Sequence, residues 1–154
     1  MPFEFTARRR VAFVDTDMAG IMHFSNYFRF MEAVEHEFVK SLGFRAIMTD
    51  ADPPLGWPRV HADCDFLRPL RFDDEVEIQL LVKGRTRRTV SYAFRFHRVA
   101  EAEAREEVAR GTLVVACVTF DGGAMRAVEI PPALADRLEI APADALPPMR
   151  YSRP

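Results

Sequence analysis

The sequence predicts an α+β domain in which an antiparallel sheet wraps around one long central helix. The first observation is an apolar stripe at helical spacing between Asn26 and about Leu42. The second is a series of strand-like segments later in the chain, joined by turns too short for parallel crossovers. A helix that is apolar over much of its circumference must be covered on several sides, and a curved sheet supplies that cover.

The N-terminal part of the chain is expected to form a strand followed by this helix. A strand is predicted within residues 3–15, where Val11 and Phe13 alternate after three arginines. The helix comes next, and Gly43 is its natural stop. Its apolar stripe consists of Tyr27, Phe30, Met31, Val34 and Phe38, widened by Phe28 and Val39.

Four further strands are expected to build most of the sheet. They are predicted at residues 60–67, 75–83, 90–96 and 112–120. The second of them is the clearest half-buried strand, with an alternating set of apolar and polar residues. The apolar members are Val76, Ile78, Leu80 and Val82, and the polar members are Glu75, Glu77, Gln79 and Lys83. The fourth is more continuously apolar, and the Asp121-Gly122-Gly123 triplet then turns the chain.

The chain is expected to be one domain over residues 1–130 with a proline-rich tail at 131–154 that is not a separate domain. A length of 154 residues, 49% of them hydrophobic, suits a single domain with its own core. The tail is expected to hold one short helix around residues 133–138 and to run over the surface or onto a neighbouring subunit.

Composition favours a cytoplasmic protein that is not exported. A formal net charge of −2 gives no electrostatic case for a nucleic acid or a membrane surface as partner. Cys64 and Cys117 each lie in an apolar run, which favours small core residues in a reducing compartment over a disulfide. No apolar run approaches the roughly 18 residues of a membrane span, and no signal peptide is recognised.

The segment at residues 15–27, DTDMAGIMHFSNY, is the candidate reactive site. It leads from a strand-like stretch through Gly20 into the helix. A helix N-terminus offers free backbone N–H groups and a partial positive charge, so it can stabilise a developing oxyanion. Asp15 and Asp17 lie just upstream, and a carboxylate there can attack a carbonyl or activate water. The alternative for Asp17 is a turn residue that binds backbone N–H groups.

Residues 17–27, followed by the long apolar helix, resemble the signature of the 4-hydroxybenzoyl-CoA thioesterase family, which has the hotdog fold. The likeness runs from about Arg10 to Glu129. It implies an acyl-CoA thioester hydrolase that needs no metal or redox cofactor, with CoA belonging to the substrate. The motif assigns the reactive carboxylate to Asp17, and the two routes, nucleophile or general base, stay open.

The same resemblance suggests roles for the residues around the start of the helix. It places the oxyanion donor at the backbone N–H of Phe24. His23 is a candidate for substrate contact, although this position of the motif usually carries an aromatic residue. Asn26 is a candidate for the substrate-binding site, where it bonds the motif loop, and the alternative is that it caps the helix.

Two further segments are candidates for substrate binding. The turn at residues 83–89, KGRTRRT, carries four positive charges, and the resemblance places Arg87 and Arg88 at coenzyme A phosphates. A solvated basic hairpin is the alternative. The irregular connection at residues 44–58 can form part of the acyl pocket with Trp57 as a wall, or be an ordinary surface loop.

Two polar clusters invite a metal-binding interpretation that we do not adopt. Glu32 and His36 are four residues apart on the helix, but a metal site needs a third ligand. His61, Asp63 and Asp65 alternate onto one strand face, which favours a polar face or an interface. Glu32 is retained as the alternative catalytic carboxylate, because another branch of hotdog thioesterases uses one on the helix.

The expected assembly is a homodimer with a continuous sheet, or a homotetramer made of two such dimers, with sites at the subunit interface. Two other functions are compatible with the fold: a hydroxyacyl-thioester dehydratase and a non-catalytic acyl-CoA sensor. The acyl group, aromatic or short or long aliphatic, is not readable from the sequence.

Overall fold

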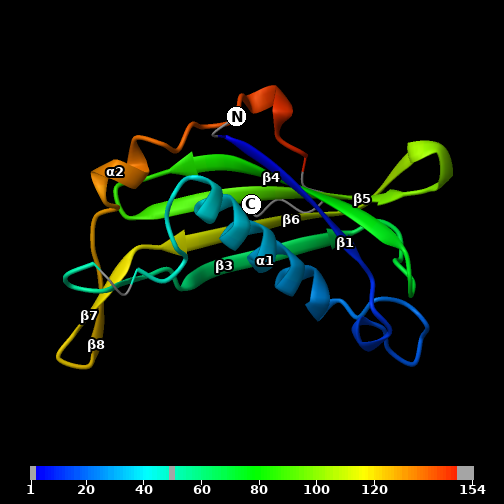
Figure 1. Cartoon of the computed structure of the whole chain (residues 1–154), viewed down its shortest axis with the longest axis horizontal. Helices are drawn as coiled ribbons and strands as arrows, with labels where there is room; N and C mark the ends of the chain where they lie inside the picture. The colour runs from blue at the N-terminus through cyan, green and yellow to red at the C-terminus, as the bar shows by residue number, and fades with distance from the viewer. Residues whose placement is uncertain (1–2, 49–50, 149–154) are drawn as a thin grey trace.

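The computed structural model describes residues 3–48 and 51–148 and contains one long helix against a five-stranded antiparallel sheet (Figure 1). This confirms the predicted fold class. The strand order of the main sheet is β1-β4-β5-β6-β3, so β1 and β3 are its edges. The strands are β1 (Glu4–Arg10), β3 (Arg59–Phe66), β4 (Glu75–Arg85), β5 (Thr89–Val99) and β6 (Arg105–Ala116). A second sheet holds β2 (Leu55–Gly56), β7 (Val118–Asp121) and β8 (Ala124–Ala127).

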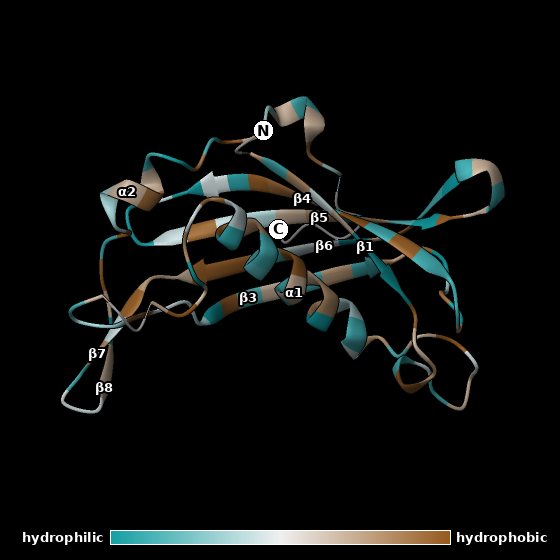
Figure 2. Ribbon diagram, in the orientation of Figure 1, coloured by the Kyte–Doolittle hydropathy of each residue, from teal (hydrophilic) through white to brown (hydrophobic). Residues whose placement is uncertain are grey.

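Helix α1 (Ser25–Ser41) lies across one face of the main sheet, as its apolar stripe predicted (Figure 1). Leu42 is its C-cap, and Gly43 follows with a φ of +90°, a conformation that side chains with a Cβ rarely adopt. Hydrophobic and hydrophilic residues alternate along the helix in Figure 2. The buried positions are Tyr27, Phe30, Met31, Val34, Glu35, Phe38 and Val39.

The core forms where α1 meets the alternating strands. The apolar residues of β4 and β5 that were expected to be buried are buried, and they join the helix stripe in one hydrophobic cluster. The rings of Phe38 and Tyr92 meet edge to face at 6.1 Å. Gly111 on β6 lies directly beneath Met31, so a Cβ at that position would collide with the methionine side chain. The close packing of the helix on the sheet at this point therefore depends on a residue without a side chain.

The predicted first strand was wrong in its second half. The strand ends at Arg10, and residues Phe13–Asp15 form a 3-10 turn in which Phe13 is 77% exposed. The arginines are tolerated in this edge strand because they alternate between two sets of acids. Arg8 pairs with Glu75 and Glu77 of β4 and with Glu103 of the turn between β5 and β6, whereas Arg9 pairs with Glu37 of α1.

The predicted strand at 112–120 also needs correction, because it spans two strands of different sheets. β6 begins earlier, at Arg105, and ends at Ala116. The chain breaks at Cys117, whose N–H donates to the Arg88 carbonyl oxygen at 2.7 Å, and β7 then enters the second sheet. Because residues 112–120 are almost continuously apolar, their sequence gives no signal that the chain passes from one sheet to the other. β8 was not predicted; it is exposed throughout and projects with β7 as a hairpin (Figure 1).

The C-terminal segment packs against both faces of the sheet. Helix α2 (Pro132–Ala135) and the turn after it bury Leu134 and Leu138 in the main core. Further along, Ala141 and Leu146 pack on Leu81 on the opposite face. Residues 149–154 of the expected tail lie outside the described part of the chain.

The two cysteines lie in or against the core, as their apolar surroundings predicted. Cys64 and Cys117 are free thiols, and burial raises the pKa of Cys117 to about 11. Within residues 3–48 and 51–148, no helix combines the length and apolar character needed to cross a membrane.

Candidate active site

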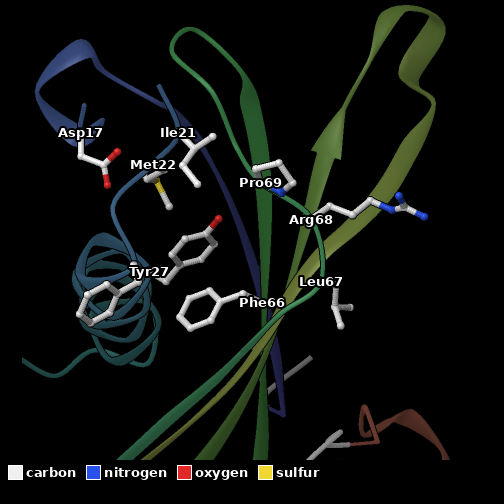
Figure 3. A pocket seen from close by; sticks show the side chains of 9 residues that line it. Asp17, Ile21, Met22, Tyr27, Phe66, Leu67, Arg68 and Pro69 are labelled. Carbon is white, nitrogen blue, oxygen red and sulfur yellow. The ribbon is translucent and has the colours of Figure 1, made fainter. Parts of the chain in front are cut away.

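A hollow of about 440 Å³ lies between the motif loop, the start of α1 and the segment that follows β3 (Figure 3). Asp17 and Phe24, the two residues expected to act together, both line it. Figure 3 shows Arg68 extending away from Asp17, which leaves mainly apolar side chains beside the carboxylate. The lining residues are Asp17, Ile21, Met22, Phe24, Tyr27, Phe66, Leu67, Arg68 and Pro69.

The loop around Asp17 is a tight turn built by its own backbone. The Asp17 Oδ1 accepts the Ala19 N–H at 2.8 Å, and the Asp17 carbonyl oxygen accepts the Gly20 N–H at 3.0 Å. Gly20 has a φ of +77°, so the turn requires a glycine there. Asp17 is exposed at the rim of the hollow. The turn role and a chemical role are compatible, because the turn uses only Oδ1 among the side-chain oxygens.

Asp15, the rival carboxylate, is only 4% exposed and is occupied by structural bonds. Its Oδ2 accepts the Ala12 N–H at 2.9 Å, and its Oδ1 pairs with Arg29. We expected Asp15 and Asp17 to share a side if the strand persisted. The strand does not persist, because residues Phe13–Asp15 form a 3-10 turn, and the two side chains go to different environments.

The first turn of α1 leaves one backbone donor without a partner. The N–H groups of the next three residues are used: Ser25 donates to His23 Nδ1, Asn26 to the His23 carbonyl oxygen and Tyr27 to the Phe24 carbonyl oxygen. The Phe24 N–H donates to no atom within the described parts of the chain. A helix N-terminus with a free N–H beside a carboxylate can polarise a carbonyl that enters the hollow.

His23 and Asn26 act within the loop in this structure. The His23 Nδ1 lies 2.8 Å from Ser25 Oγ, and its ring packs on Phe24 at 4.6 Å. His23 is not among the residues that line the hollow. The Asn26 amide donates to the Asp15 carbonyl oxygen at 2.8 Å, so of its two expected roles the loop contact is the one present.

Tyr27 contributes a buried phenol to the floor of the hollow. Burial raises the pKa of Tyr27 to about 12. The hydroxyl therefore stays neutral at physiological pH. Its ring lies edge to face with Phe66 at 5.0 Å, which ties the helix start to the end of β3.

The arginine turn lies at the other end of the sheet from Asp17 in the same chain. Arg87 and Arg88 are exposed at the β4–β5 turn, while the motif loop follows the opposite end of β1 (Figure 1). Arg87 pairs with Glu129, and Arg88 makes no ion pair within the described residues. One copy of the chain therefore does not bring the predicted phosphate-binding residues to the predicted reactive carboxylate.

Trp57 lies outside the Asp17 hollow. It lines a separate hollow of about 410 Å³ beside the middle of α1, together with Glu32, His36 and Arg59. Its indole Nε1 is buried and has no hydrogen-bond partner within the described residues. The connection at 44–58 contains residues 49 and 50, which the structure does not describe.

Glu35 is a buried acid that our sequence interpretation missed. It is 2% exposed, and Arg59 Nη2 donates to its Oε2 at 2.6 Å. Burial raises the pKa of Glu35, even though the charge of Arg59 acts in the opposite direction. The signal was present in the sequence, because Glu35 falls four residues after Met31 and three before Phe38, inside the apolar stripe.

The remaining polar candidates form pairs and not metal sites. His36 Nε2 lies 3.7 Å from Glu35, and Glu32 lies 3.3 Å from Arg59. His61 Nε2 lies 2.7 Å from Asp63 Oδ2 on β3. In the parts of the chain that the structure describes, no three His, Cys, Asp or Glu side chains gather as metal ligands would.

Comparison with known proteins assigns the family. A model of the thioesterase-like superfamily matches residues 11–138, which is most of the chain. The chain belongs to this superfamily. The chain has the hotdog fold, as the sequence resemblance implied.

Relatives within this superfamily include two named acyl-CoA hydrolases. A 4-hydroxybenzoyl-CoA thioesterase of Pseudomonas sp. (strain CBS-3) is 26% identical over 143 residues, 91% of this chain and 99% of the relative. A 1,4-dihydroxy-2-naphthoyl-CoA hydrolase of Nostoc punctiforme is 34% identical over 77 residues, and that match spans about half of each chain, 50% and 52%.

A solved structure gives the fold independently. A mutant of 4-hydroxybenzoyl-CoA thioesterase complexed with 4-hydroxybenzoyl-CoA superposes with a TM-score of 0.77 at 22% identity. The match covers 88% of this chain and 99% of the other.

Proposed function

We propose that this chain hydrolyses an acyl-CoA thioester to a free acid and CoA. The observation that carries the proposal is that Asp17 and Phe24 line one hollow at the start of α1, where the Phe24 N–H has no partner among residues 3–48 and 51–148. Membership of the thioesterase-like superfamily, with acyl-CoA hydrolases among its relatives, supports the same chemistry.

In the proposed mechanism the thioester carbonyl oxygen accepts the Phe24 N–H, and the N-terminal dipole of α1 stabilises the charge that develops there. Asp17 then acts in one of two ways. As a nucleophile it forms a mixed anhydride and expels the CoA thiolate, after which water cleaves the anhydride. As a base it takes a proton from water, whose oxygen attacks the carbonyl; the C–S bond then breaks, the CoA thiolate leaves and recovers the proton from Asp17, and the free acid remains. Both routes use only groups of the protein and water, because the thioester is already activated.

We further propose that the working unit is a two-fold homodimer that pairs β3 edges. β3 has a strand neighbour on one side only, and two strands that pair antiparallel across a two-fold axis run in opposite directions. Such pairing brings the arginine turn of one copy to the Asp17 end of the other. The separation of these groups within one chain supports the dimer, and pairs of dimers would give a tetramer.

The direct test is release of thiol from a panel of acyl-CoAs, followed with a thiol reagent. The panel should contain benzoyl, 4-hydroxybenzoyl, 1,4-dihydroxy-2-naphthoyl, butyryl and palmitoyl esters. Saturable release from one class supports the proposal and names the acyl group. Tight binding without release would make the protein a sensor, and loss of water from a 3-hydroxyacyl-CoA would make it a dehydratase.

Replacing Arg87 and Arg88 together with alanine is expected to raise KM for CoA esters about tenfold and to leave kcat nearly unchanged. Charge-assisted phosphate contacts contribute about 1.5–3 kcal/mol each, reduced at an exposed turn by salt. The loss is binding energy shared by substrate and transition state, so a truncated pantetheine thioester should be hydrolysed as before. Arg88 should account for most of the effect, because Glu129 already holds Arg87.

Arg105→Ala is the matched control for this pair. Arg105 is an exposed arginine beside another turn of the sheet, where Glu77 pairs with it at 2.8 Å. It should leave KM unchanged. An equal loss of rate on both substrates after the double substitution would assign the two arginines a structural role.

Specific activity is expected to fall in step with dimer dissociation on dilution. Phe66 of the edge strand β3 lines the hollow around Asp17, so in the proposed dimer a lone protomer lacks the walls and the arginines that a partner supplies. Light scattering and the thiol assay should be run over the same concentration series. A fully active monomer would contradict both the dimer and the placement of the site across it.

A further inference from the structure

The β3 edge carries two different faces. Cys64 packs against the core beneath α1, and the Phe66 ring contacts Tyr27, so the even-numbered residues face the helix. His61 and Asp63 alternate with them and lie on the opposite face of the sheet. Val60 is an extra residue in the pairing of β3 with β6, so regular alternation begins at His61.

Asp63 is incompletely satisfied within its own chain. His61 binds its Oδ2 at 2.7 Å, but its Oδ1 is buried and has no hydrogen-bond partner within the described residues. A carboxylate oxygen left without a donor is costly, so it indicates a donor that comes from outside this chain. Exposed Val60 and Phe66 on the same edge strand would also lose water on pairing.

Two registers pair a second copy along most of this edge. Residues directly opposite each other in an antiparallel pair point to the same face, so a two-fold axis passes beside a residue and its own copy. An axis near the middle of β3 (Arg59–Phe66) passes beside either Ala62 or Asp63. An axis at Asp63 puts two aspartates directly opposite each other, which is unfavourable. An axis at Ala62 puts His61 opposite the partner's Asp63, twice per dimer.

We infer that β3 pairs with β3 of a second copy in the register centred on Ala62, where reciprocal contacts between His61 and the partner's Asp63 set the alignment. This inference rests on the β3-edge dimer of the proposed function and specifies its register. The segment before Val60 of the partner then runs beside Phe66, which lines the Asp17 hollow. The second copy thus supplies a wall of the site, and Trp57 and Arg59 lie on the segment that supplies it.

Disulfide trapping tests the register directly. Directly opposite residues have Cα atoms about 4.5–5.5 Å apart, within the range that a disulfide spans. In a Cys64→Ala background, Ala62→Cys is expected to give mostly covalent dimers on mild oxidation. Asp63→Cys, one residue away on the other face, is the matched control and should stay uncrosslinked. Crosslinking of Asp63→Cys alone, or of neither variant in a protein that is dimeric by light scattering, would overturn the register.

A charge exchange tests the contact itself. His61→Asp places like charges opposite each other twice per dimer and should weaken association about tenfold or more. Adding Asp63→His restores opposite partners across the axis and should recover most of the dimer. Failure of the double variant to recover would contradict the reciprocal contact.

These readouts separate the register from the chemistry. Crosslinking and dissociation are measured without substrate, so an inactive but correctly crosslinked protein would reject the thioesterase and keep the register. An active protein that crosslinks through Asp63→Cys would keep the thioesterase and reject the register.

Discussion

Asp17→Asn is expected to lower kcat by about a thousandfold, within the range that loss of a nucleophile or general base produces. The amide is close in size, and its oxygen can still accept the Ala19 N–H, so the turn should remain. It can neither attack the carbonyl as a carboxylate does nor take a proton from water. The thiol assay gives kcat, and calorimetry of acyl-CoA binding and a melting curve should show an intact protein.

Two other carboxylates serve as controls for Asp17. Asp15→Asn removes the charge that holds Arg29 and should lower the melting temperature as well as the rate. Glu32→Gln affects an acid on the surface of α1 and should leave kcat near the wild-type value. An inactive Glu32→Gln variant beside a fully active Asp17→Asn variant would move the reaction to the helix carboxylate.

Arg59→Met is expected to lower the free energy of unfolding by about 3–5 kcal/mol at neutral pH, the usual cost of leaving a buried charge without its partner. Glu35 is enclosed by the core and Arg59 is its close cation, at 2.6 Å. Adding Glu35→Gln removes the stranded charge and should restore much of the loss. Urea unfolding at one fixed protein concentration measures both variants.

The loss of stability caused by Arg59→Met should increase with pH. Burial raises the pKa of Glu35 above its ordinary value of 4.5, so above that value the folded chain holds this proton more tightly than the unfolded chain. Stability therefore falls as pH rises from the ordinary pKa through the raised one. Arg59 opposes that rise in pKa, so its removal should widen the window. The loss caused by Arg59→Met should be smaller at pH 5 than at pH 8, and an equal loss at both would contradict the assignment.

The strands that could be predicted from the sequence are those in which apolar and polar residues alternate. β4 alternates apolar and polar residues from Glu75 to Leu80, and its pattern identified the residues that face the core correctly. The run at 112–120 is apolar at nearly every position, so periodicity could not detect that the chain leaves one sheet at Cys117 and enters another. The first strand was predicted to extend too far because Phe13, an exposed aromatic residue on a 3-10 turn, looks like a strand residue in the sequence.

The candidate site was predictable where it is local. Asp17 and Phe24 are seven residues apart, so a single turn brings them to the same hollow. Arg88 and Trp57 belong to other ends of the sheet, and their relation to Asp17 depends on how two copies meet, which periodicity does not encode. Glu35 was overlooked because a single acid in an apolar stripe looks exposed until its partner Arg59, on a distant strand, is known.

The proposed carbonyl donor belongs to the backbone of Phe24, whose side chain is 59% exposed and fills no core position. Every amino acid except proline carries that N–H. The carbonyl contact therefore excludes only proline at residue 24, and other changes there should act through the lining of the hollow, which Phe24 helps to form. A search for distant members of the superfamily that compares side chains will recognise the acid and overlook its partner, and in a library randomised at residue 24 only the proline variant should lose the carbonyl donor.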